Sequence, residues 1–192
     1  MNTQNLFDYA EQRYKHARNL IAEMTKLVQE NQPSFKERSA YCQFDIMVQF
    51  ILLNIALADG KFSEIEGEFI DEITESYDVL FLFDSDDDTD YDWSFVGAYM
   101  TLEHAEYLVN TVKKRAIEHI QSFICVFAEA ELLDNGRKYF DELFKCIKDI
   151  ASAFIMCDGN ATKKEIELAV NVVRQYFTNP WLTQQNKLKN PR

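Results

Sequence analysis

The sequence has few of the residues that interrupt or cross-link a chain. It contains five glycines, three prolines and four cysteines in 192 residues. The cysteines lie far apart without a C-x-x-C pair, which excludes a disulfide framework and argues against a zinc site. No run of about 18 uncharged apolar residues occurs and no secretory leader is recognisable, so no membrane span is expected. These absences predict a soluble cytoplasmic protein.

Positive charge is also scarce. The chain has 20 Lys and Arg against 32 Asp and Glu, a net charge of −12. Nucleic acids and anionic membranes are bound mainly through Lys and Arg contacts to phosphate, so we expect neither as a partner. The chain contains no G-x-S-x-G, P-loop, G-x-G-x-x-G or H-E-x-x-H motif. We therefore favour a non-catalytic protein with a protein or cation partner, although an acidic surface also serves solubility.

Apolar residues recur at helical spacing through most of the chain. They make up 47% of the residues, enough for a substantial core. No stretch alternates apolar and polar residues as a strand does. The pattern predicts an all-α protein, a compact bundle of about seven helices. The last of these is expected to bury Ile166 and Val170 and to end at Asn179–Pro180, with a loose polar tail beyond.

One segment of this pattern occurs twice. Residues 41–77 and 140–176 align at an offset of 99 residues without a gap, and Ile51 falls on Ile150. Each copy has an apolar helix, an acidic turn and a second helix. Such self-similarity indicates a supersecondary unit used twice. We predict two pseudo-repeated helix–turn–helix halves.

Each unit turns at an Asp-Gly pair that precedes a Ser/Thr-x-x-Glu motif. The carboxylates are Asp59 and Glu66 in the first turn, and Asp158 and Glu165 in the second. One interpretation is structural, because Gly ends the first helix and the Ser/Thr-x-x-Glu caps the next. The other is that the four carboxylates meet and hold a divalent cation, Ca²⁺ or Mg²⁺. Neither turn is a complete EF-hand, so such a site needs both.

The turn segments resemble a known family. ALADGKFSEIE at 56–66 is similar to the first signature of the tellurite-resistance TerB family, and to the TerB-like domain of certain DnaJ-type co-chaperones. MCDGNATKKE at 156–165 resembles the second signature. The resemblance implies an all-helical domain with two pseudo-repeated halves and acidic residues that chelate metal. It also implies links to chemical stress and to partner proteins.

The same resemblance suggests a division of the chain. The TerB-like helical domain would cover residues 35–178, with residues 1–34 as an added helix and 179–192 as a polar tail. The segment 84–92 reads DSDDDTDYD and would be an acidic loop inserted into the domain. Charge repulsion within this run favours an extended conformation.

Two functions follow from these observations. The preferred one is a non-catalytic, stress-associated TerB-like module that binds partner proteins. It would also hold a divalent cation at a patch made by Asp59, Glu66, Asp158 and Glu165. The alternative is a metal-dependent hydrolase in which the same carboxylates hold a cation that activates water. Homo-oligomerisation stays open.

Overall fold

The protein is a bundle of helices. The computed structural model describes residues 3–58, 60–74, 78–82, 100–134, 137–159 and 161–189, and no strand occurs among them. The all-α prediction is therefore confirmed. In chain order the elements are α1 (Thr3–Asn31), α2 (Glu37–Ala56), α3 (Glu64–Ile73), the 3₁₀ turn η1 (Asp78–Leu82), α4 (Leu102–Leu133), α5 (Tyr139–Met156), α6 (Lys163–Val173), the π-helical turn η3 (Arg174–Thr178) and α7 (Asn179–Lys189).

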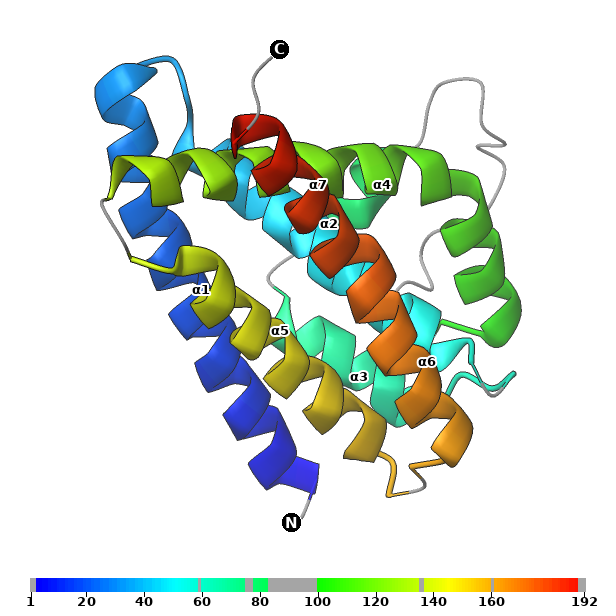
Figure 1. Ribbon diagram of the computed structural model, residues 1–192. Coiled ribbons are helices and arrows are strands. Elements are labelled where there is room, and N and C mark those ends of the chain that lie inside the picture. The colour runs from blue at the N-terminus through cyan, green and yellow to red at the C-terminus, as the bar shows by residue number, and fades with distance from the viewer. Residues whose placement is uncertain are drawn as a thin grey trace.

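The helices α6 and α7 form one continuous rod through η3. Counted in this way, the described part of the chain has six separate helices, where the sequence predicted about seven. Figure 1 shows the rod lying across the front of the bundle, with α1 and α5 side by side to its left and α4 wrapping around the right and the top.

Helix α2 forms the centre of the core. It is buried on nearly all sides and contacts α1, α3, α4, α5 and α6. By length and composition it is the one described helix that meets the requirements of a membrane span, and 72% of its apolar window is buried inside the fold. A helix that is apolar all round is typical either of a protein core or of a membrane.

Two polar networks fix the neighbours of α2. Tyr14 of α1 donates a hydrogen bond to the buried carboxylate of Asp45, and Arg18 Nη1 lies 3.4 Å from Asp45 Oδ2. The fully buried Gln49 donates to Thr74 Oγ1 at 3.0 Å and accepts from the backbone N–H of Val79 at 3.0 Å. Because buried polar groups are costly unless they are paired, these bonds specify how α1 and η1 dock.

The predicted helix end at Asn179–Pro180 is wrong. The backbone continues through the π-turn η3 into α7, which reaches Lys189, so residues 183–189 are helical and not a loose tail. Proline cannot donate the helical hydrogen bond and its ring crowds the preceding turn, and a wider π-turn before it relieves this conflict.

Aromatic packing favours the continuation of this helix. Phe140 stacks on Trp181 of α7 with 4.1 Å between ring centroids, and on Phe177 of η3 at 4.9 Å. Phe144 stacks on Phe177 at 5.5 Å. Such tertiary contacts outweigh the local stop signal, because most helical stability in proteins comes from packing. The predicted acidic loop at 84–92 lies outside the described residues.

Candidate functional site

The glycines of the two turns share one backbone conformation. Gly60 and Gly159 both have φ of +77°, in the left-handed region that other residues resist. The N–H of Gly60 bonds to the carbonyl of Leu57 at 3.4 Å, and that of Gly159 to the carbonyl of Met156 at 3.2 Å. The glycines therefore end α2 and α5 in the same way, as the structural interpretation predicts.

Both predicted capping boxes are present. Glu66 Oε2 accepts hydrogen bonds from the Ser63 N–H at 2.7 Å and from the Ser63 hydroxyl at 2.9 Å, and Ser63 Oγ accepts from the Glu66 N–H. Glu165 Oε2 accepts from the Thr162 N–H at 2.5 Å, and Thr162 Oγ1 accepts from the Glu165 N–H at 3.2 Å. Both glutamates are buried. Each has one carboxylate oxygen engaged in beginning a helix.

Three of the four predicted carboxylates lie in the described part of the chain, and Asp59 does not. Burial, together with the nearby negative charges of Glu66 and Asp158, raises the pKa of the Cys157 thiol to about 12. Glu66 from the first turn thus lies near the second turn. Figure 1 places the α5–α6 connection at the bottom of the bundle and the α2–α3 connection above it, on the right-hand side.

The described residues do not form a metal centre. Among the described residues, no three His, Cys, Asp or Glu side chains are grouped so that they could hold a metal ion. Glu66 and Glu165 each use Oε2 for capping, so a cation would compete with a backbone N–H for that oxygen. The cation site stays a prediction that requires Asp59 as well.

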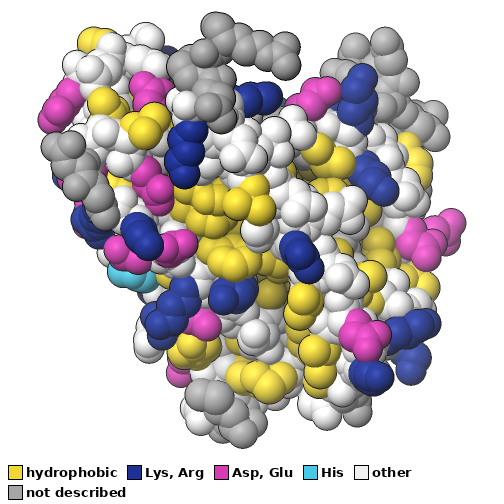
Figure 2. Space-filling model, in the orientation of Figure 1, with side chains coloured by type: hydrophobic (Ala, Val, Ile, Leu, Met, Phe, Trp, Pro, Cys, Tyr) yellow, Lys and Arg dark blue, Asp and Glu magenta, His cyan; other side chains and the backbone are white. Residues whose placement is uncertain are grey.

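An open apolar groove lies between α5 and the rod α6–η3. Its volume is about 610 Å³. The residues that line it are mainly apolar and include no carboxylate: Phe144, Lys148, Ala151, Ser152, Ile155, Met156, Ala161, Ile166, Ala169, Val170, Val173, Arg174 and Thr178. Figure 2 shows apolar side chains gathered on this face of the molecule. We call this feature the α5–α6 groove.

The exposed part of the groove corrects an expectation from the sequence. Ile166 and Val170, predicted to be buried, are 49% and 62% exposed, and Met156 is 47% exposed. The other residues of α6 that were predicted to be buried, Ala169 and Val173, do pack inward. Helical periodicity identifies an apolar stripe but does not reveal how much of its width a neighbour covers. The apolar stripe of α6 is wider than the face that α2 and α5 cover. Its width is visible in the sequence, and the covered part is not.

The groove has a polar end. Lys148 and Arg174 line it and make no ion pair within the described residues, although Lys148 Nζ lies 4.9 Å from the centre of the Phe144 ring. The hydroxyl oxygen of Thr178 is buried there without a hydrogen-bond partner. Because the Phe144 and Phe177 rings stack, this end lies between the middle of α5 and the turn η3. Met156 and Ile166 form the opposite, apolar end.

Comparison with known proteins adds no relative. No family model, curated protein or solved structure matches this chain. The groove and the turns are therefore the features from which a function can be inferred.

Proposed function

We propose that this protein is a non-catalytic helical module that binds partner proteins through the α5–α6 groove. The observation that carries the proposal is the contiguous exposure of Met156, Ile166 and Val170 beside an apolar groove. Contiguous exposed apolar surface often marks a site of interaction with another protein or a ligand. A grooved face with a charged end also offers the mixture of apolar contact and polar orientation that protein interfaces use.

The proposal includes a relationship to the TerB-like fold and the stress-associated role that the resemblance implies. Its support is the agreement between the two turns. They share the glycine conformation and the capping box, and they occur at the same spacing in two helix pairs. The stress-associated role is supported by the resemblance of the turn segments alone.

Affinity capture followed by reconstitution tests the interaction role. The wild-type chain, Ile166→Asp/Val170→Asp and the control Leu132→Asp/Leu188→Asp would each be used to capture proteins from the source cells. The control residues are also exposed and apolar but lie outside the groove. We expect a partner that the wild type and the control retain and the groove variant loses. That partner, once purified, should bind the wild type in calorimetry with the same dependence.

The role is opposed if no captured protein depends on the groove. Circular dichroism checks that the groove variant is folded. If the double variant unfolds, the single variant Val170→Asp replaces it, because a residue 62% exposed tolerates a charge with little cost.

The cation is a separate part of the proposal. Asp59, Glu66, Asp158 and Glu165 would bind Ca²⁺ or Mg²⁺ between the two turns. Calorimetric titration with each ion should give heat and a raised melting temperature in the wild type. Glu66→Gln/Glu165→Gln is the matched control, because Gln also completes a capping box but removes the charge. Absence of heat in the wild type removes both the cation and the hydrolase alternative, which depends on it.

A further inference from the structure

The shape of the α5–α6 groove limits what it can bind. On α5 its lining runs from Phe144 to Met156, about 18 Å at 1.5 Å per residue. This length equals about three turns of a second helix. The opposite wall presents Ile166, Val170 and Val173 at the spacing of one helical ridge. Two such walls form the receptor for an amphipathic helix laid between them.

Charge further specifies the occupant. The chain carries a net charge of −12, but the groove contains two cations and no carboxylate. Some basic side chains of the bundle are held in ion pairs, for example Arg13 with Asp149 at 3.1 Å and Arg18 with Asp45. Lys148 and Arg174 make no ion pair within the described residues, so both cations are available to a ligand. A ligand with carboxylates at one end would complement them.

The second copy of this chain and a small amphiphile fit less well. A two-fold contact that packs groove against groove would cover Lys148 and Arg174 of both copies without supplying a carboxylate, because the groove contains none, and this costs free energy. A small ligand would remain largely in water, because Val170 is 62% exposed on the open side. Binding sites for small molecules usually bury most of the ligand surface.

We propose that the α5–α6 groove binds an acidic amphipathic helix of a partner protein. Apolar side chains of that helix, three or four residues apart, pack on Met156, Ile166 and Val170. Its carboxylates pair with Lys148 and Arg174 at the polar end. This inference rests on the proposed function and specifies the partner's chemistry.

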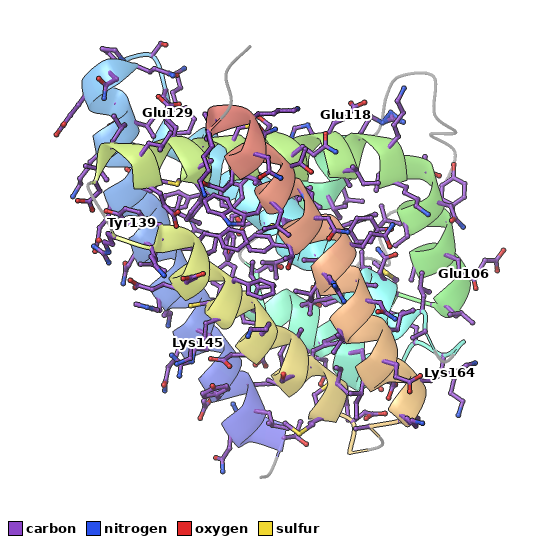
Figure 3. All side chains as sticks on the ribbon, in the orientation of Figure 1. Glu106, Glu118, Glu129, Tyr139, Lys145 and Lys164 are labelled. Atoms are coloured by element: carbon purple, nitrogen blue, oxygen red, sulfur yellow. The ribbon has the colours of Figure 1, made fainter. Side chains whose placement is uncertain are left out.

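The test uses designed peptides of about four turns. One has leucine at every third or fourth position and glutamate elsewhere, and its counterpart replaces each glutamate with lysine. Fluorescence anisotropy measures the binding of each peptide to the full chain. The charge-reversal variant is Lys148→Glu/Arg174→Glu. The matched control is Lys163→Glu/Lys164→Glu, which changes net charge equally at exposed lysines outside the groove; Lys164 points outward from α6 in Figure 3.

We expect the acidic peptide to bind the wild type and the control with similar affinity. The charge-reversal variant should bind it at least about tenfold more weakly and should prefer the lysine peptide instead. Val170→Asp should also weaken the binding of the acidic peptide. Circular dichroism and thermal melting verify that each variant is folded.

Several results would overturn the inference. They are absent binding of the acidic peptide, equal losses in the charge-reversal and control variants, or a groove-dependent dimer in sedimentation. Displacement of the acidic peptide by laurate, with tighter binding of laurate itself, would assign the groove to an amphiphile. If a captured natural partner depends on Val170 but not on Lys148 or Arg174, the interaction role stands and the acidic helix is excluded.

Discussion

The helix pairs α2–α3 and α5–α6 turn in the same way and yet occupy different environments. Aligned at the same offset, Gly67 of α3 corresponds to Ile166 of α6, and Asp71 to Val170. At these two positions the first pair has a glycine, which has no side chain, and a charged aspartate. The second pair exposes two apolar side chains there. The two pairs thus share the way they turn, while the outer surfaces of α3 and α6 differ.

The packing partners explain this difference. Helix α3 packs against α1 as well as α2, and its Phe69 ring meets Phe7 of α1 edge-on at 5.1 Å. Gly67 is buried in α3. Helix α6 packs against α2 and α5, and it retains an apolar ridge in water. The comparison teaches that one pair serves the core and the other offers a surface.

Truncation of the corresponding core side chains should separate the two pairs most strongly. Phe69 is fully buried between Phe7 and Phe154, whereas its counterpart Leu168 is half-buried. We expect Phe69→Ala to lower the free energy of unfolding by about 4 kcal/mol, and Leu168→Ala by about 1–2 kcal/mol. Urea denaturation measures both, with unchanged m-values as the check on two-state unfolding. Equal losses would contradict the assignment of one pair to the core.

The polar counterparts Gln49 and Lys148 provide a second contrast. Gln49→Ala leaves the Val79 N–H and the Thr74 hydroxyl without the bonds described above, so we expect a loss of about 3 kcal/mol. Lys148→Ala should change stability by less than about 0.5 kcal/mol, because its ammonium has no ion pair to lose within the described residues. Chemical denaturation measures the free energy of unfolding of both variants. A large loss for Lys148→Ala would show that this lysine stabilises the fold.

Local signals in the sequence predicted the turns well. A left-handed glycine and a capping box involve only residues within one turn of each other, so Gly60, Ser63 and Glu66 could be assigned from spacing alone. The capping box of Thr101 at the start of α4 is equally local. Helical periodicity is also a local pattern, and it predicted that these segments are helices.

Features that depend on docking could not be predicted. The exposure of Val170 depends on which helices arrive beside α6, and the continuation past Pro180 depends on the stack of Trp181 with Phe140. The proximity of Glu66 to Cys157 likewise arises from tertiary structure. Sequence patterns report what a segment can bury and not what is available to cover it.

The two glycines should respond alike to substitution. A Cβ added at Gly60 or Gly159 would meet no atom within 4 Å, so only the positive φ opposes it. We expect Gly60→Val and Gly159→Val each to cost more than about 1 kcal/mol, by thermal or urea unfolding. Asn tolerates this conformation, so Gly→Asn at either site should cost less. Unequal costs would mean that the turns are not equivalent.

The caps should give the smallest and most closely matched effects. Ser63→Ala and Thr162→Ala each remove the hydroxyl that accepts the N3 backbone N–H, and each should cost about 1 kcal/mol. Exchanging the two residue types, with Ser63→Thr and Thr162→Ser, keeps that acceptor and should be nearly neutral. The carboxylate half of each box is retained in all four variants, so the difference isolates the hydroxyl. The Ser63 hydroxyl also donates a hydrogen bond to Glu66 Oε2. A much larger loss of stability in Ser63→Ala than in Thr162→Ala would indicate that this second bond contributes to stability.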